Sequence, residues 1–160
     1  MRTVLLPILL IAAVAPAVAA ELTGQASVID GDTIEIHGQR IRLHGIDSPE
    51  GSQLCYRDGE PWPCGRRAAF ALADYIGDRT VICEPRDRDR YGRIVAVCFA
   101  GGHDLNAWMV RQGWALAYRR YSRDYVAGEE AAREDGTGMW AGRFTPPWDW
   151  RRGKRLAPSG

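Results

Sequence analysis

Acidic and basic residues gather in short segments that together could hold a cation against a phosphate group. Residues 42–50 read Arg-Leu-His-Gly-Ile-Asp-Ser-Pro-Glu, so one arginine and two carboxylates fall within nine positions. Asp30 and Asp32 lie upstream in the run Asp-Gly-Asp-Thr, and residues 89–93 read Asp-Arg-Tyr-Gly-Arg. Carboxylates are hard oxygen ligands, and the planar fork of arginine matches a phosphate. The three segments therefore predict a site where a metal ion and a phosphate meet.

Each of these segments taken alone has an ordinary structural interpretation. An Asp-Gly pair, as at residues 30–31, is a common turn between two strands. Residues 47–50 could be a rigid corner, because proline and short polar side chains favour turns. Residues 89–93 could be the charged tip of a hairpin. The functional interpretation depends on their joint occurrence in one chain.

The apolar pattern predicts the elements that would position these residues. Alternating apolar residues indicate strands, and an i, i+3, i+4, i+7 pattern indicates helices. The expected strands lie near 26–32, 34–36, 41–43, 80–84 and 93–99. The first expected helix covers 65–76, the second is capped by Asp104 and ends at Gly113, and the third covers 122–134. This order predicts an α+β fold dominated by a five-stranded Greek-key barrel of the oligonucleotide/oligosaccharide-binding (OB) type, with about three helices.

One feature of the strand pattern argues against a shared site for Arg42 and Asp47. Arg42 and Asp47 have opposite parity, so an undisturbed strand would direct them to different faces. Gly45 lies between them and is the expected position of a bend or bulge that brings both side chains to one pocket.

The first 20 residues, 1–20, have the composition of a signal peptide. Arg2 precedes an apolar run over 4–14 and small residues follow, so cleavage is expected before Ala20 or Glu21. An uncleaved anchor is the alternative, but this apolar run is short for a membrane span. We therefore expect an exported protein, periplasmic or secreted, with no membrane segment after cleavage.

The remaining chain has the size of one domain. We expect that domain to cover 21–145, followed by an irregular basic tail over 146–160. The 20 lysines and arginines left after loss of Arg2 balance the 20 acidic residues. Because the mature net charge is zero, any binding of nucleic acid would need a local patch of charge.

The four cysteines form an even set, which in an exported chain predicts disulfides. Three pairings are possible. Cys55 and Cys64 bracket a proline-containing loop, and Cys83 and Cys98 lie at equal distances from the centre of the predicted hairpin, so we expect these two pairs. A four-cysteine zinc site is the alternative, but the chain has no Cys-x-x-Cys pair.

These segments, in this order, resemble the staphylococcal nuclease (thermonuclease) family over essentially the whole mature length. The resemblance is carried by residues 28–33, 42–50, 89–93 and 106–113. It implies an OB-type barrel and a calcium-dependent, monomeric nuclease that hydrolyses phosphodiester bonds. DNA and RNA would be cut with little sequence specificity, preferably where single-stranded or frayed, and the products would end in 3′-phosphates.

The resemblance also implies roles for individual residues. Two carboxylates and a backbone carbonyl would hold calcium with a supporting acid, two arginines would bind the phosphate, and a glutamate would orient or deprotonate the attacking water. The calcium ligands would be Asp32, Asp47 and the backbone carbonyl of Ser48, with Asp30 as the supporting acid. The two arginines would be Arg42 and Arg93, and the glutamate would be Glu50.

The chain departs from the family pattern at a few positions. The family commonly has threonine at the position of Ser48, a change that a backbone-carbonyl role tolerates. Its nucleotide-stacking tyrosines correspond to Tyr118 and Arg120, with Tyr121 as a neighbouring substitute. These three residues are the predicted substrate-binding residues. The basic runs 119–123 and 151–155 are open candidates for phosphate contacts, with a solvated face as the alternative, and Trp62, Trp148 and Trp150 could be base platforms or cover apolar surface.

Two functions from other classes compete with a nuclease. A barrel of this type could be a non-catalytic nucleic-acid-binding module, because fold alone does not fix function. A structural or adhesive envelope protein is the other alternative. Both would be expected to lose the charged residues of the site, whereas Asp32, Arg42, Asp47, Glu50 and Arg93 are all present.

Overall fold

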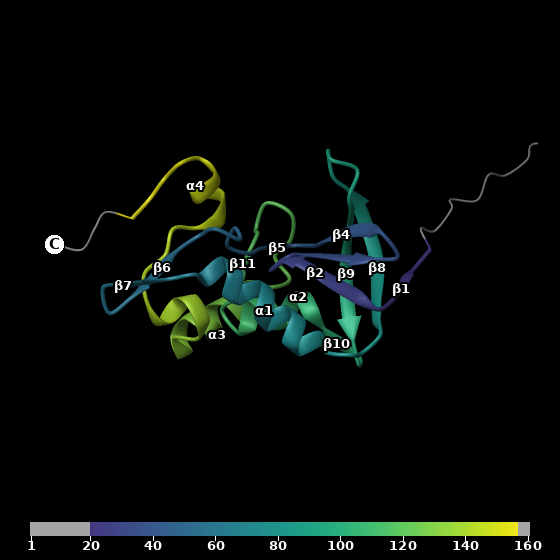
Figure 1. The fold of residues 1–160 in the computed structure, drawn as a ribbon, viewed down its shortest axis with the longest axis horizontal. Coiled ribbons are helices and arrows are strands. Elements are labelled where there is room, and N and C mark those ends of the chain that lie inside the picture. The colour runs from purple at the N-terminus through teal and green to yellow at the C-terminus, as the bar shows by residue number, and fades with distance from the viewer. Residues whose placement is uncertain (1–19, 157–160) are drawn as a thin grey trace, which may run out of the picture.

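A mixed β-sheet and several short helices form the structure, a computed structural model that describes residues 20–156 (Figure 1). The predicted signal peptide lies outside the described residues except for Ala20. The main sheet has the order β1-β8-β9-β4-β3-β2, with β10 paired to β9. Its strands are β1 (Leu22–Gly24), β2 (Ala26–Asp30), β3 (Thr33–Ile36), β4 (Gln39–Leu43), β8 (Val81–Arg88), β9 (Ile94–Ala100) and β10 (His103–Asp104).

The sheet closes on itself. Its end strands, β1 and β2, are separated along the chain only by Gln25, so one bent segment pairs with β8 at one end and with β3 at the other. All pairs are antiparallel except β4 with β9. The five barrel segments are therefore β1–β2, β3, β4, β8 and β9, which confirms the predicted α+β, barrel-dominated fold.

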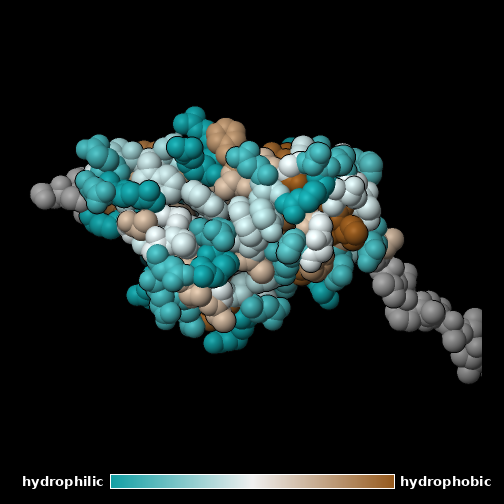
Figure 2. All heavy atoms as spheres, turned by 90° about the horizontal axis from the view of Figure 1, so that it is seen from below, coloured by the Kyte–Doolittle hydropathy of each residue, from teal (hydrophilic) through white to brown (hydrophobic). Residues whose placement is uncertain are grey.

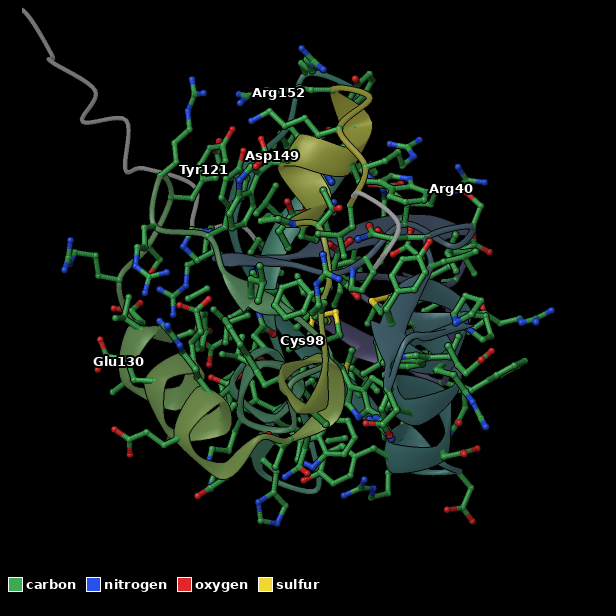
Figure 3. All side chains as sticks on the ribbon, turned by 90° about the vertical axis from the view of Figure 1, so that its left-hand side faces the viewer. Arg40, Cys98, Tyr121, Glu130, Asp149 and Arg152 are labelled. Carbon is green, nitrogen blue, oxygen red and sulfur yellow. A yellow bond between two sulfur atoms is a disulfide. The ribbon has the colours of Figure 1, made fainter. Side chains whose placement is uncertain are left out.

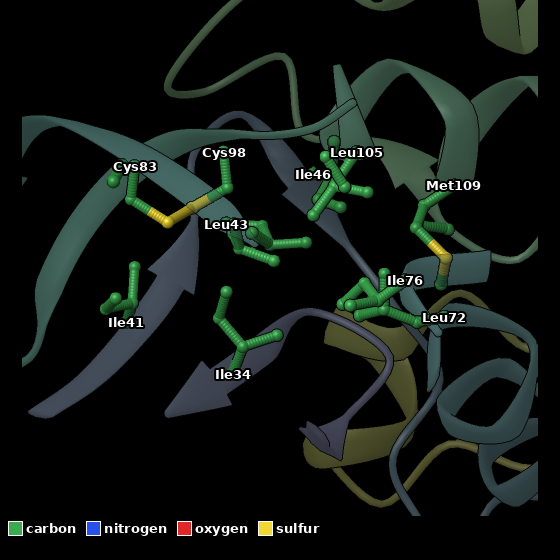
Figure 4. Close-up of a cluster of buried hydrophobic side chains, with 14 of the residues drawn as sticks. Ile34, Ile41, Leu43, Ile46, Leu72, Ile76, Cys83, Cys98, Leu105 and Met109 are labelled. Atoms are coloured by element: carbon green, nitrogen blue, oxygen red, sulfur yellow. A yellow bond between two sulfur atoms is a disulfide. The ribbon is translucent and has the colours of Figure 1, made fainter. Parts of the chain in front are cut away.

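The interior of the barrel is the main core of the molecule (Figure 4). Alternate residues of each strand point inward, as the period-2 pattern requires. Ile34, Ile41 and Leu43 are at most 1% exposed, and Leu72 of α1 (Cys64–Ile76) and Met109 of α2 (Leu105–Arg111) pack onto the same cluster. The strand β4, which carries Arg42, packs one face on this core and is paired with β3 on one side and with β9 on the other.

Helical segments complete the fold, and the first two of them contribute buried residues to the core of the barrel. They are α1 (Cys64–Ile76), α2 (Leu105–Arg111), α3 (Val126–Asp135), the short 3₁₀ helix η1 (Gly138–Ala141) and α4 (Pro147–Arg151). The Asp104 side chain caps α2 by accepting from the backbone N–H of Ala107, as predicted. The third helix starts at Val126, four residues after the predicted 122.

A small core lies beside the barrel and is formed by Cys55, Cys64, Leu116 and Met139. The strands β6 (Cys55–Arg57) and β7 (Glu60–Trp62) form a hairpin there, and β5 (Ile46–Asp47) pairs with β11 (Leu116–Ala117). Figure 1 shows β6, β7 and α4 at the end of the molecule opposite β8 and β1.

Both predicted disulfides are present. Cys55 and Cys64 are joined across a Cα–Cα distance of 5.6 Å. Cys83 and Cys98 are joined across 4.1 Å and are direct partners in the register of β8 and β9. One bridge therefore belongs to the small core and the other to the main core.

The expectation of an irregular tail over 146–160 is wrong for residues 147–151, which form α4. Pro147 occupies the first turn, where its fixed φ suits a helix and no hydrogen bond is lost. Pro147 is buried and Trp148 packs on the small core, so tertiary packing stabilises a helix too short to form alone.

Figure 2 shows one face of the molecular surface. The face in Figure 2 is mostly hydrophilic, with apolar side chains in separate small spots. Across residues 20–156, no helix has both the length and the apolar character needed to cross a membrane.

Candidate active site

The carboxylates of the predicted site come together where β4 ends. Gly45 follows β4 with a φ of +72°, a conformation that favours glycine, and the chain turns there into β5. This turn brings Arg42 and Asp47 to the same pocket despite their opposite parity. Arg42 donates from Nη1 to Asp32 at 3.0 Å and from Nη2 to Asp47 at 2.9 Å, so one guanidinium bridges both acids.

Asp32 is placed by the register of the barrel. Thr33 is the partner of Arg42 across β3 and β4, so the preceding residue lies beside the guanidinium. The Asp32 carboxylate also accepts from the backbone N–H of Ser48 at 2.8 Å. Asp30 supports the turn by accepting from the Asp32 N–H at 3.1 Å.

Burial of the Asp32 side chain, which is 5% exposed, has an electrostatic consequence. Loss of hydration disfavours the charged carboxylate and raises its pKa to about 7, although Arg42 opposes this. Burial lowers the pKa of Arg42, but the two carboxylates outweigh that effect and raise it overall.

Asp47 is fully buried and receives hydrogen bonds from two arginines. Besides Arg42, Arg151 of α4 donates to it twice: from Nη2 to Oδ2 at 2.6 Å and from Nη1 to Oδ1 at 3.0 Å. Arg151 Nη1 also lies 2.7 Å from Glu50 Oε1. Asp32, Asp47, Glu50 and Arg42 are called the acidic site below.

The donor set of the acidic site fits a hard cation. A carboxylate has about four lone-pair positions. Asp32 uses three of them, on Arg42, Thr33 and Ser48, and Asp47 also uses three, two of them on Arg151. Each carboxylate therefore keeps room for a ligand bond, and two buried acids need nearby positive charge.

The predicted metal set is nevertheless sparse. Among residues 20–156 no group of three or more histidine, cysteine or acidic side chains could hold a metal ion. The predicted ligands are two carboxylates and the Ser48 carbonyl, so the remaining ligands would have to be water or substrate.

Glu50 lies at the open side of the acidic site, with its side chain 41% exposed. The backbone beside it is fixed by Gln53, which is fully buried and whose Oε1 accepts from the Glu50 N–H at 3.3 Å. Gln53 also donates to the carbonyl of Thr145 at 2.6 Å, which joins this loop to the segment before α4.

Arg93 makes its contacts within the β8–β9 loop. Its Nε donates to Asp89 at 2.7 Å, and its guanidinium lies 5.6 Å from the ring centre of Tyr91. Burial raises the pKa of Asp89, but hydrogen bonds from Arg93 and Tyr91 lower it overall. The bond to Asp89 uses Nε and does not involve the two Nη groups of Arg93.

The predicted substrate-binding residues differ in their surroundings. Tyr118 lies next to the acidic site, because its N–H donates to the Gly45 carbonyl at 2.8 Å. Its ring stacks on Trp148 at 5.6 Å and meets Tyr121 edge to face at 5.0 Å. Arg120 is exposed. Figure 3 shows Tyr121 and Asp149 of α4 toward the same end of the molecule.

Two contributors to the site, Arg151 and Trp148, were open candidates in the sequence that were not assigned to the acidic site, and a third, Gln53, was not predicted. The run Trp-Asp-Trp-Arg-Arg at 148–152 was a usable signal for the first two, because tryptophan and arginine together favour nucleic-acid contacts. No local pattern marks Gln53, whose role depends on a partner 92 positions away.

Comparison with known proteins places these observations in a family. Residues 40–142 match the family described as "Staphylococcal nuclease homologue". The match spans Arg42, Asp47, Glu50 and Arg93, whereas Arg151 lies beyond it.

Several curated proteins are similar to the chain. It is 42% identical over 123 residues to the succinoglycan biosynthesis protein ExoI of Rhizobium meliloti (strain 1021), an alignment that covers 74% of this chain and 64% of that protein. It is 35% identical over 148 residues to an uncharacterized endonuclease of Escherichia coli, which covers 87% and 91% of the two chains. A micrococcal nuclease of Shigella flexneri is 34% identical over 148 residues, which covers 81% and 80%.

Proposed function

Because the chain belongs to the staphylococcal nuclease family, we propose that it is an exported, calcium-dependent nuclease that cuts DNA and RNA with little sequence specificity. As a member of this family, it is a phosphodiester hydrolase. The finer features proposed are calcium as the metal, 3′-phosphate product ends, a monomeric state and a preference for single-stranded or frayed substrate.

A single observation carries the proposal: one guanidinium bridges two buried carboxylates beside a partly exposed glutamate. Asp32, Asp47 and the Ser48 carbonyl would hold the cation. A bound divalent cation would act as a Lewis acid on a phosphoryl oxygen. The family is generally metal-dependent, which agrees with this donor set.

The chain's own side chains would perform the remaining steps. Arg42 keeps the two carboxylates at a fixed separation and has further N–H donors for a phosphate oxygen. Glu50 is open to solvent and would accept a proton from the attacking water. Charge that develops on the phosphoryl oxygens would be matched by arginine donors that are already in place.

Export is supported by the cysteines. Both disulfides join residues that are completely buried, and such bridges persist in oxidising compartments. The predicted signal peptide would deliver the chain to the periplasm or the medium.

The test is cleavage of a plasmid and of a structured RNA by the purified protein. We expect both to be cut with calcium, activity to stop in excess chelator, and calcium to restore it. The 3′ ends of the products should be joined by a ligase only after a 3′-phosphatase has removed their phosphate groups. Binding of both substrates without cleavage under any metal would contradict the proposal and favour the non-catalytic binding module.

A further inference from the structure

Arg151 is an arginine outside the predicted site that contacts two of its carboxylates. Its Nη2 and Nη1 lie 2.6 and 3.0 Å from the two oxygens of Asp47, and Nη1 lies 2.7 Å from Glu50. Arg42 is the other arginine that bonds to Asp47. Arg93, the second arginine predicted for the phosphate, instead bonds to Asp89 in its own loop.

The position of Arg151 is fixed by packing of α4. Pro147 is buried, and Trp148 packs on the small core with its ring parallel to Tyr118. The segment before α4 is tied to the loop after Glu50 through the bond from Gln53 to Thr145. The backbone of Arg151 therefore stays beside the acidic site, even when the hydrogen bonds of its guanidinium break.

The oxygens that Arg151 uses are those a cation would need. Asp47 has one of its oxygens bonded to both arginines and the other to Arg151 alone. The side chain of Asp47 is inaccessible, whereas that of Arg151 is 38% exposed. A cation bound to either oxygen of Asp47 would therefore lie against the positive guanidinium of Arg151 and repel it, and Arg151, the more accessible of the two partners, would move.

We propose that Arg151 is a further phosphate-binding arginine of the site, in addition to those predicted: it leaves Asp47 when that carboxylate binds a cation, and its guanidinium then binds an oxygen of the substrate phosphate. This inference rests on the proposed function. A planar guanidinium can bind a phosphate through two parallel hydrogen bonds, as it binds the Asp47 carboxylate here.

The same helix points to a nucleotide as the ligand. Trp148 lies three positions before Arg151 on α4 and extends the aromatic surface of Tyr118 and Tyr121. Bases stack on such surfaces, while arginine binds the adjoining phosphate. The five-residue helix α4 thus presents Trp148 for stacking with a base and Arg151 for binding the adjoining phosphate.

The experiment compares Arg151→Gln and Arg151→Lys with wild type and with Arg152→Gln. Arg152 is the matched control because it follows Arg151 directly at the C-cap of α4, its side chain is 70% exposed, and within residues 20–156 its one ion pair is with Asp149 at 3.9 Å. Calorimetric titration measures the affinity for calcium alone, and then the affinity for a nucleoside 3′,5′-bisphosphate in saturating calcium. Urea denaturation checks that each variant is folded.

In Arg151→Gln we expect calcium alone to bind more tightly, because the competing cation is gone. The bisphosphate should bind about 10- to 100-fold more weakly, because a charged hydrogen-bond donor is lost. Arg151→Lys should recover part of the bisphosphate affinity, and Arg152→Gln should match wild type in both titrations.

Unchanged or tighter bisphosphate binding in Arg151→Gln would overturn the inference, because Arg151 would then only block the metal site. Weaker binding of both ligands together with lower stability would also overturn it in favour of a structural role. If wild type itself neither binds the bisphosphate nor cleaves nucleic acid, the proposed function fails and the inference fails with it. If wild type does both and Arg151→Gln matches Arg152→Gln, the inference alone fails.

Discussion

At the scale of single residues, the acidic site depends on the shape of the Arg42 side chain. Two separate nitrogens of one guanidinium bond to Asp32 and Asp47, at 3.0 and 2.9 Å. A lysine would carry the same charge on one nitrogen, which cannot reproduce a planar fork. The separation of the two carboxylates would then no longer be fixed, and a hard cation would meet a less ordered set of oxygens.

We therefore expect Arg42→Lys to lower the single-turnover cleavage rate by about 100- to 1,000-fold, the loss typical of removing one preorganised donor. The matched control is Arg40→Lys on the same strand, where the side chain is 63% exposed and pairs with Glu35 only at 3.8 Å. Rates are measured in calcium on a short oligonucleotide. Similar rates in both variants would remove Arg42 from the proposed chemistry.

Glu50 provides a second prediction at this scale. Glu50→Gln keeps the size of the side chain but removes the proposed base, so cleavage should fall by about 100- to 10,000-fold. Affinity for the bisphosphate should change little, because the ion pair that Glu50 makes with Arg151 is partly exposed and such pairs contribute weakly.

Glu60→Gln on the exposed hairpin strand β7 is the control and should leave both quantities unchanged. The measurements are single-turnover rates and bisphosphate titrations. A Glu50→Gln enzyme with wild-type turnover would assign the base to another group.

At the scale of elements, the turn between β4 and β5 decides whether the site exists. Gly45 has a φ of +72°, and a Cβ there would lie 3.0 Å from both Ser122 and a ring carbon of Tyr125. Two constraints therefore act at one position: a left-handed backbone and close packing. Arg42 and Asp47 meet only because the chain turns here.

Gly45→Ala should lower the free energy of unfolding by about 2–4 kcal/mol, from backbone strain plus overpacking. Gly38→Ala separates the two causes, because its φ is +76° but no atom lies within 4 Å of the added Cβ. That variant should lose about 1–2 kcal/mol. Equilibrium urea denaturation measures both, and equal losses would show that packing against Tyr125 contributes nothing.

Elements with local signals were predictable, and those that depend on distant partners were not. The hairpin of β8 and β9 follows from alternation and turn residues, and the symmetry of its cysteines predicts the observed pairing of Cys83 with Cys98. The turn at Gly45 follows from a glycine between two residues of opposite parity. By contrast, α4 has five residues and gains its stability from the small core, which no pattern within 146–160 reveals. For the same reason the sequence marks Arg151 only as part of a basic run, and its contacts with Asp47 and Glu50 were not predicted.

At the scale of the whole molecule, each of the two cores contains one disulfide. Cys83–Cys98 lies in the main core of the barrel, and Cys55–Cys64 lies in the small core, where Trp148 also packs. The bridged positions are 15 and 9 residues apart, so the chain-entropy contributions of the two bridges are similar, about 3 kcal/mol each. Any difference between the effects of removing the two bridges must then come from the elements that each core holds in place.

The last prediction uses the similar chain-entropy contributions of the two bridges. The double variants Cys83→Ala/Cys98→Ala and Cys55→Ala/Cys64→Ala should both lose about 3 kcal/mol of unfolding free energy in urea. Only the second should also weaken substrate affinity, because the small core holds α4 and thereby Trp148 and Arg151. Cleavage rates over a range of substrate concentrations should show a higher KM and a nearly unchanged rate at saturation for Cys55→Ala/Cys64→Ala. An equal rise in KM for both variants would show that the small core has no separate part in binding, and would leave α4 without a role in the substrate site.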